Sequence, residues 1–106
     1  MLSGIQKLKA MLMQVVEHSL GMPSLMLGES MEQISSNMDT RTMRQPLGVV
    51  AGIAPFNFPA MIPLWMIPIA VSTGNAIILK PSEKVPSASH RIVELATQAG
   101  LPPGAT

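Results

Sequence analysis

The 106-residue sequence contains no cysteine. That absence excludes a disulfide framework, a thiolate metal site and a thiol nucleophile within these residues. Charge is also scarce, because 12% of the residues are charged while 47% are hydrophobic. A typical soluble domain carries about 25% charged residues. Two interpretations remain open: a very stable small core, or a piece of a larger protein whose apolar faces are covered by further chain or by partner subunits.

The few charged residues also limit the partners that can be expected. The net charge is +1, and the seven basic residues are scattered along the chain. Because these residues form no basic patch, the sequence does not predict nucleic-acid binding. His18 and His90 lie far apart in the sequence without a metal-ligand spacing. We expect both histidines on helix surfaces, and we predict neither a nucleic acid nor a metal ion as a partner.

One uncharged stretch is long enough to suggest a membrane helix. No charged residue occurs between Arg44 and Lys80, which leaves 35 uncharged residues (80 − 44 − 1). Four prolines between residues 55 and 68 argue against a continuous helix, because each removes a backbone donor. Strands covered on both faces also give apolar runs. We therefore prefer a buried strand–helix–strand and no membrane partner, with a membrane-associated peptide over residues 49–71 as the weaker alternative.

The first half of the chain predicts one helix and a less regular segment. Residues 3–20 carry apolar residues at three- and four-residue steps, which indicates an amphipathic helix. Within residues 24–47, short runs near 31–35 and 40–43 suggest a hairpin, which we expect to serve subunit contact rather than chemistry. The predicted apolar face of the helix consists of Ile5, Leu8, Leu12, Val15 and Val16.

The second half alternates strand and helix signals. Short apolar runs predict two buried strands, and proline and glycine punctuation predicts the helix ends. The expected elements are a strand at 48–54, a helix from residue 58 or 59, a strand at 75–79 and a helix from residue 86 or 87 to 98. The apolar face of the last helix is predicted to consist of Ala88, Ile92, Leu95, Ala96 and Ala99.

This order predicts an α/β fold with a partial Rossmann-like parallel sheet. A strand, a crossover helix and a second strand give two adjacent parallel strands. Residues 1–47 would form an N-terminal helix and hairpin segment, and residues 48–106 the first half of a nucleotide-binding βαβ domain. Two strands alone make a poor sheet, which again suggests a larger protein.

Polar residues follow both predicted strands, where an open α/β sheet binds its ligands. Glu83 can accept hydrogen bonds from two ribose hydroxyls and would repel a 2′-phosphate, which favours NAD over NADP. Lys80 can donate to the same sugar. The alternative is a solvated surface ion pair, since no Gly-x-Gly-x-x-Gly supports a nucleotide site. Asn57 can stabilise an oxyanion or, alternatively, cap the next helix.

Several of these segments resemble a known family. Ile53–Pro59 (Ile-Ala-Pro-Phe-Asn-Phe-Pro), Gly74-Asn75 and Leu79–Glu83 resemble the cofactor domain of the aldehyde dehydrogenase superfamily. Phe56–Pro59 followed by Ile62–Met66 resembles its CoA-acylating methylmalonate-semialdehyde dehydrogenase branch. The likeness covers about residues 14 to 104.

The resemblance implies a role for each matching residue and for the ligands. It implies an aldehyde substrate, NAD as cofactor, CoA as co-substrate and a homo-oligomer, a tetramer if complete. It implies a mitochondrial protein in eukaryotes and a cytoplasmic one in bacteria. The implied site comprises Asn57 as oxyanion stabiliser, Ala54 and Phe56 beside the nicotinamide, Lys80 and Glu83 on the adenosine ribose, and Lys84 as a basic neighbour.

The sequence also departs from the family pattern. The family's nucleophile is a cysteine that forms a thioester, and its counterpart would lie beyond Thr106. Met11 occupies the place where the branch carries an arginine for the substrate carboxylate. We therefore expect these 106 residues alone not to oxidise aldehydes. The alternative is a non-catalytic relative that binds NAD weakly or pairs with a full-length subunit.

Overall fold

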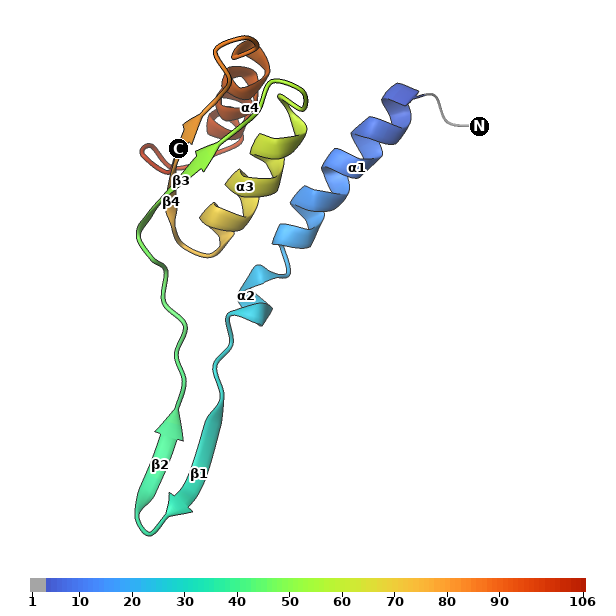
Figure 1. Cartoon of the computed structure of the whole chain (residues 1–106). Helices are drawn as coiled ribbons and strands as arrows, with labels where there is room; N and C mark the ends of the chain where they lie inside the picture. The colour runs from blue at the N-terminus through green and yellow to red at the C-terminus, as the bar shows by residue number, and fades with distance from the viewer. Residues whose placement is uncertain (1–3) are drawn as a thin grey trace.

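The computed structural model describes residues 4–106, without the side chains of Ile5, Lys7 and Leu8. The chain is elongated, with extents of 60 × 36 × 25 Å and a radius of gyration of 17.9 Å, whereas a compact chain of this length has about 13 Å. Figure 1 shows why: a hairpin projects as an arm away from the helices and the sheet. The elements are α1 (Gly4–Ser19), α2 (Met22–Leu25), β1 (Ser30–Ser35), β2 (Met38–Arg41), β3 (Val49–Ile53), α3 (Met61–Ser72), β4 (Ala76–Lys80) and α4 (Ser87–Gln98).

The arm is the antiparallel hairpin of β1 and β2. Ser36 and Asn37 form its turn, and Asn37 adopts a left-handed φ of 60°, which asparagine tolerates well. Every residue of both strands is exposed. The predicted hairpin is confirmed, with its second strand beginning at Met38 instead of residue 40.

Two hydrogen bonds hold the base of the arm together, one between backbone groups and one from a side chain. The amide of Thr42 donates to the carbonyl oxygen of Glu29 at 2.8 Å, and Arg44 Nη1 donates to the carbonyl oxygen of Leu25 at 3.0 Å. Gly28 lies so close to Thr42 that a Cβ there would be 1.6 Å from the Thr42 carbonyl oxygen. The chain can cross at this point only because residue 28 has no side chain.

The second half of the chain confirms the predicted β-α-β-α order. β3 and β4 are adjacent and parallel, paired in register from Val49–Ala76 to Ile53–Lys80, and α3 connects them. Helix α3 begins at Met61, later than the predicted residue 58 or 59. Ala60 is its N-cap, at φ −102° and ψ −40°.

One face of this two-stranded sheet packs against α3. Strand alternation directs Val50 and Ile77 to that face, where Ile77 joins Ile67 and Ala70 of α3 in the core. Gly52 faces α3 as well, and a Cβ there would come within 2.9 Å of Met66 Sδ. Further partly buried residues around the core are Met66, Val71, Leu79, Ile92 and Val93.

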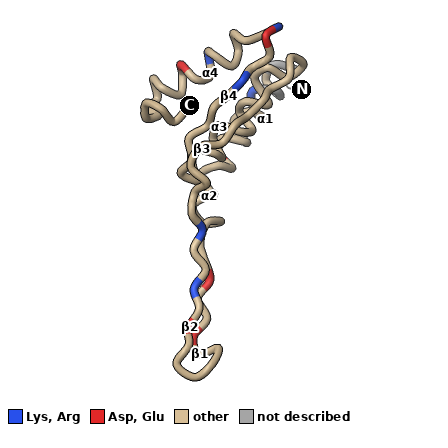
Figure 2. The backbone as a smooth tube through the Cα atoms, turned by 60° about the vertical axis from the view of Figure 1, so that its left-hand side comes forward, with Lys and Arg blue, Asp and Glu red and all other residues tan. Residues whose placement is uncertain are grey.

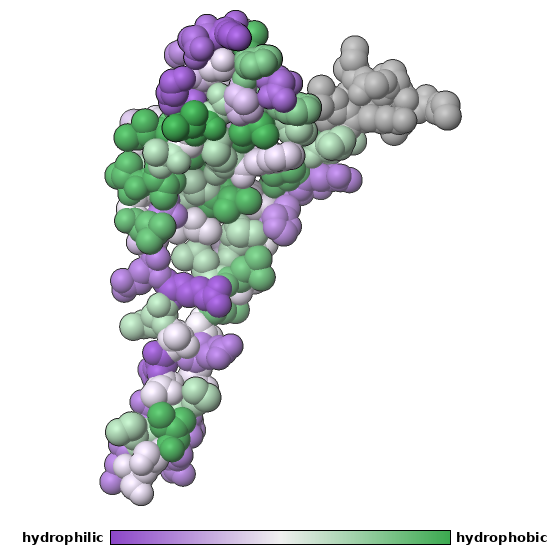
Figure 3. All heavy atoms as spheres, in the orientation of Figure 1, coloured by the Kyte–Doolittle hydropathy of each residue, from purple (hydrophilic) through white to green (hydrophobic). Residues whose placement is uncertain are grey.

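The opposite face of the sheet is apolar and exposed, so the prediction that both strands are buried was wrong for this face. Val49, Ile53 and Ile78 all project from it into solvent. Figure 3 shows hydrophobic side chains spread over this part of the molecule, with hydrophilic ones gathered above it and along the arm. In the tube view, charges in this half lie at the end of β4 and on α4 (Figure 2). The surplus of apolar residues in the composition is therefore on the surface, as expected for faces that other chain covers.

The structure bears out part of the predicted apolar face of α1 and corrects that of α4. Helix α1 packs on α3, with Leu12 and Val15 half-buried. The prediction was wrong for Val16, which is 41% exposed. The side chains of Ile5 and Leu8, and residue 3, lie outside the described residues. On α4 the prediction was wrong for Leu95 and Ala99, which are exposed, because the inward face is shifted by one position. That inward face comprises Ala88, Ser89, Ile92, Val93 and Ala96.

Three further expectations concern surfaces and boundaries. His18 and His90 are exposed on α1 and α4, as predicted. Within the part of the chain that the structure describes, no helix is both long and apolar enough to span a membrane. The division of the chain at residues 47 and 48 stays a prediction.

Candidate functional site

The ends of β3 and β4 lie side by side. Ile53 pairs with Lys80, and the amide of Ala54 donates to the Lys80 carbonyl oxygen at 3.0 Å. The loop after β3 and the loop after β4 therefore leave the sheet at the same edge, as Figure 1 shows at the upper end of the molecule. This edge is where parallel sheets bind ligands.

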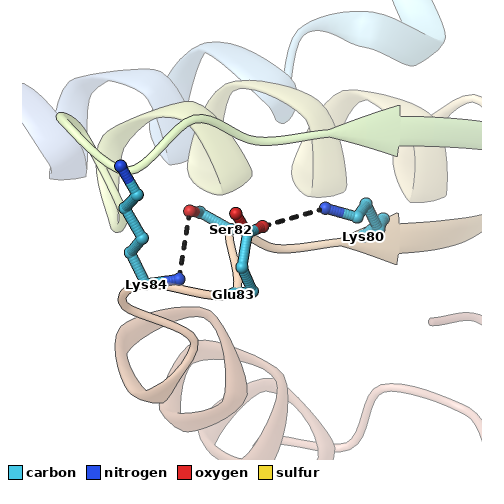
Figure 4. A network of polar contacts seen from close by, with 4 residues as sticks. All are labelled: Lys80, Ser82, Glu83 and Lys84. Atoms are coloured by element: carbon cyan, nitrogen blue, oxygen red, sulfur yellow. Dashed lines mark hydrogen bonds and ion pairs between the residues drawn. The ribbon is translucent and has the colours of Figure 1, made fainter.

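The loop after β4 presents an ion pair to solvent. Lys80 Nζ lies 3.5 Å from Glu83 Oε2, and the two side chains are 63% and 78% exposed. Buried Ser82 shapes the turn between them, because its Oγ accepts a hydrogen bond from the Lys84 amide at 3.3 Å (Figure 4). An exposed pair of this kind adds little to folding stability, and both groups remain within reach of a ligand.

Glu83 is held in its ionised form. A backbone hydrogen bond lowers the pKa of its carboxyl below the ordinary value of 4.5, and the hydrogen bond and positive charge of Lys80 lower that pKa further. Because the pKa of Glu83 is lowered, its ion pair with Lys80 is fully present at any pH above the ordinary Glu pKa. The pair is lost as the pH falls through the lowered pKa. At neutral pH the loop therefore offers a carboxylate acceptor.

This electrostatic arrangement predicts the effect of removing Lys80. In Lys80→Met, the pKa of Glu83 is expected to rise towards its ordinary value, although the backbone hydrogen bond keeps it below that value. A pH titration of the Glu83 carboxyl carbon by NMR measures the change. Lys84→Met is the matched control and should leave the midpoint unchanged. An unchanged midpoint in Lys80→Met would contradict the pairing.

The loop after β3 carries Asn57 in an exposed position. Its side-chain amide has no hydrogen-bond partner within the described part of the chain, so both N–H groups can donate to a ligand. The alternative that Asn57 caps the following helix is wrong. The N-cap is Ala60, and no side chain makes a capping hydrogen bond. Ala54, by contrast, is buried where this loop leaves the sheet.

The loop after β3 is contacted at two points by residues that follow β4, one in the loop after β4 and one on α4. Lys84 Nζ lies 4.7 Å from the centre of the Phe56 ring, a cation–π contact between the loops. Ser89, on the first turn of α4, donates from Oγ to the Pro59 carbonyl oxygen at 3.1 Å. Sequence reasoning missed Ser89. The available signal was its spacing, three residues before Ile92, which places it on the inward face of α4.

Comparison with known proteins then decides the family. The model of the aldehyde dehydrogenase family matches residues 6–106. The chain belongs to the aldehyde dehydrogenase family. The resemblance drawn from Ile53–Pro59 and Leu79–Glu83 is thereby confirmed.

Two relatives within this family are named as semialdehyde dehydrogenases. The chain is 60% identical over 92 residues to the mitochondrial acylating methylmalonate-semialdehyde dehydrogenase of Arabidopsis thaliana, covering 87% of this chain and 15% of the relative. It is 52% identical over 91 residues to malonate-semialdehyde dehydrogenase 1 of Geobacillus kaustophilus, covering 86% of this chain and 19% of the relative. The chain thus spans less than a fifth of the length of these two relatives.

Solved structures of this family share the fold of the chain. A methylmalonate-semialdehyde dehydrogenase from Oceanimonas doudoroffii matches with a TM-score of 0.86 and 46% identity, over 91% of this chain and 20% of that structure. A structure named for the same activity, from Sinorhizobium meliloti 1021 and complexed with NAD, matches with a TM-score of 0.86 and 47% identity over the same shares. The partial parallel sheet and hairpin are therefore part of an aldehyde dehydrogenase fold.

An apolar hollow in this aldehyde dehydrogenase segment lies away from the two loops. It has a volume of about 500 Å³ and opens among α1, α3 and α4. Its walls are apolar and include Leu64, Ile67 and Ile92. Because it offers almost no polar group, it does not suit a nucleotide, and the sheet edge remains the candidate site.

Proposed function

We propose that the chain carries half of the NAD site and one oxyanion donor of an NAD-dependent, CoA-acylating semialdehyde dehydrogenase. The observation that carries the proposal is the meeting of the segments that follow β3 and β4 at one sheet edge. The Lys84–Phe56 contact joins the two loops, and the Ser89–Pro59 contact joins α4 to the loop after β3. Family membership and the NAD-complexed relative support it.

The loop after β4 would hold the adenosine ribose. The Glu83 carboxylate is ionised and exposed, and can accept hydrogen bonds from both ribose hydroxyls. Lys80 can donate to the same sugar, and Lys84 adds a second positive charge nearby. On the neighbouring loop, Ala54 and Phe56 would line the nicotinamide side. Bound NAD supplies a hydride acceptor, so these residues bind and orient the nucleotide but do not themselves react.

Asn57 would act on the substrate carbonyl. Its unpartnered amide can donate to the oxygen on which negative charge develops during attack on an aldehyde. A single donor of this kind contributes on the order of 3 kcal/mol to lowering the barrier. The proposed substrate is a malonate-type semialdehyde, by likeness to the named relatives. Met11, at the place expected for a carboxylate-binding arginine, offers no charge for that carboxylate.

The thiol chemistry would come from outside these residues. The 106 residues contain no cysteine, so the thioester cannot form on them. We therefore propose that the isolated chain does not oxidise a semialdehyde. In the complete enzyme we propose CoA as co-substrate and a homo-oligomer, a tetramer, with mitochondrial placement in eukaryotes and cytoplasmic placement in bacteria.

A second candidate is a non-catalytic relative that binds NAD weakly or pairs with a full-length subunit. The apolar sheet face of Val49, Ile53 and Ile78, together with the fully exposed arm, favours pairing. Size-exclusion chromatography with a complete methylmalonate-semialdehyde dehydrogenase separates the two candidates. A chain that elutes unchanged as a monomer would reject pairing.

Nucleotide titration tests the cofactor half of the proposal. The wild-type chain is expected to bind NAD more tightly than NADP, as measured by NMR chemical-shift titration of the residues after β4. Glu83→Gln should weaken NAD binding by about tenfold, since it removes a charged acceptor. It should also reduce the ratio of the affinity for NAD to the affinity for NADP. Glu94→Gln is the matched control, because Glu94 also forms an exposed ion pair, in which its Oε2 lies 3.0 Å from Arg91 Nη1. Equal effects of the two substitutions would refute a ribose site at Glu83.

A further inference from the structure

We propose that Ser89 is a positioning residue for Asn57. Its hydrogen bond to Pro59 ties the loop after β3 to the first turn of α4. The segment after β4, which would hold the nucleotide, thereby controls where the carbonyl-binding amide lies. This inference rests on the proposed function, which gives Asn57 its role.

The loop from residue 54 to residue 60 has little structure of its own. One end is held by the Ala54 amide, which donates to the Lys80 carbonyl oxygen at 3.0 Å. The other end joins α3, where the Ile62 amide donates to the Phe58 carbonyl oxygen at 3.3 Å. Asn57 lies between these ends, so other parts of the chain must restrict its position.

Ser89 supplies such a restriction from a buried position. The serine is 2% exposed, and its Oγ lies 3.1 Å from the Pro59 carbonyl oxygen, thirty residues away in the sequence. A buried hydroxyl without a partner is unfavourable, so this bond selects one placement of the loop over others. Pro59 is two residues after Asn57, close enough for that placement to reach the amide.

Lys84 supplies a second restriction on the other side of Asn57. Its Nζ lies 4.7 Å from the centre of the Phe56 ring, one residue before Asn57. Figure 4 shows the Lys84 side chain extending from the β4 loop to the β3 loop. Both restrictions come from the stretch of residues 84–89. A nucleotide that moves this stretch therefore moves Asn57 as well.

Amide hydrogen exchange in the ligand-free chain tests the positioning role. Ser89→Ala is expected to lower the protection of the Ile62 amide by about fivefold, because the acceptor of Ile62 lies in the released loop. The Thr73 amide, bonded to Ile69 at the far end of α3, should keep its protection. Ser87→Ala is the matched control, since Ser87 is exposed on the same helix turn. Equal losses at Ile62 and Thr73 would mean general destabilisation and overturn the proposal, as would no loss at Ile62.

The Asn57 side-chain NMR signal gives a second measurement. Ser89→Ala should shift it, and Ser87→Ala should not. Lys84→Met removes the exposed contact between Lys84 and Phe56 and should also shift the Asn57 signal. This variant replaces Ser89→Ala in the experiment if Ser89→Ala does not fold. Adding NAD should shift the signal in the wild type but much less in Ser89→Ala, whereas equal shifts would overturn the coupling. If NAD perturbs no signal of the wild type, the proposed function fails, while the comparison of Ile62 with Thr73 still decides the role of Ser89.

Discussion

Replacing Gly28 by alanine is expected to unpair the base of the arm. The new Cβ would lie 1.6 Å from the Thr42 carbonyl oxygen, and because this neighbour is backbone, the two chain segments must separate. Separation breaks the 2.8 Å hydrogen bond from the Thr42 amide to Glu29. A two-stranded hairpin is marginal by itself, so we expect the strand pairing to be lost with the base. Hydrogen exchange of the Thr42 amide measures the loss as protection falling to that of an open chain.

A second glycine provides the control for this prediction. A Cβ at Gly21 would lie 3.4 Å from the His18 carbonyl oxygen, an ordinary contact, and Gly21 has φ −80°. Gly21→Ala should therefore keep the arm intact. Retained protection of Thr42 in Gly28→Ala would show that the arm does not depend on this close crossing. If the arm serves subunit contact, Gly28→Ala should also abolish pairing with a full-length subunit while nucleotide binding persists.

Replacing Ile77 by alanine is expected to destabilise the sheet unit by about 2–5 kcal/mol, the usual cost of an isoleucine-to-alanine change in a core. Ile77 is 3% exposed and packs against Ile67 and Ala70 in a core of few residues. So small a core has little spare stability, and the substitution should leave much of the chain unfolded. Urea unfolding followed by the fluorescence of Trp65 measures the shift in midpoint.

The adjacent residue of the same strand is the matched control. Ile78 points to the opposite face and is 65% exposed. Ile78→Ala removes the same atoms from a site that is mostly in water, so its cost should stay below about 1 kcal/mol. Equal destabilisation by the two substitutions would show that both faces of the sheet are buried in solution, for instance by a second copy of the chain.

Local sequence patterns predicted the order of elements because each pattern reports nearby physics. Short apolar runs marked β3 and β4, with β-branched residues supporting the first of them, and Pro-Ser before an apolar series marked the start of α4. Parallel strands end at one edge, so the meeting of the segments that follow β3 and β4 was expected from topology without coordinates. The contacts Ala54–Lys80 and Phe56–Lys84 show that these segments do meet. The roles of these residues stay predictions until the titrations are made.

Other features depended on contacts between distant residues. The inward face of α4 was misplaced because Leu95 is apolar and Ser89 is not, yet the hydroxyl is buried against Pro59. Whether Asn57 caps a helix depends on the residue at which α3 begins. The structure places the N-cap at Ala60, so Asn57 is not the capping residue. Hydrophobicity along one helix does not report which polar group finds a buried partner.

The sequence by itself determined the family, the β-α-β-α order and the set of candidate groups, because these depend on residue identity and local spacing. Only the tertiary structure decided that the chain extends into an arm and leaves one sheet face bare. It alone brought Lys84 to Phe56 and Ser89 to Pro59, which precede and follow Asn57 in its loop. The reason is physical: packing and buried hydrogen bonds join residues up to thirty positions apart, and no local pattern encodes which partners meet.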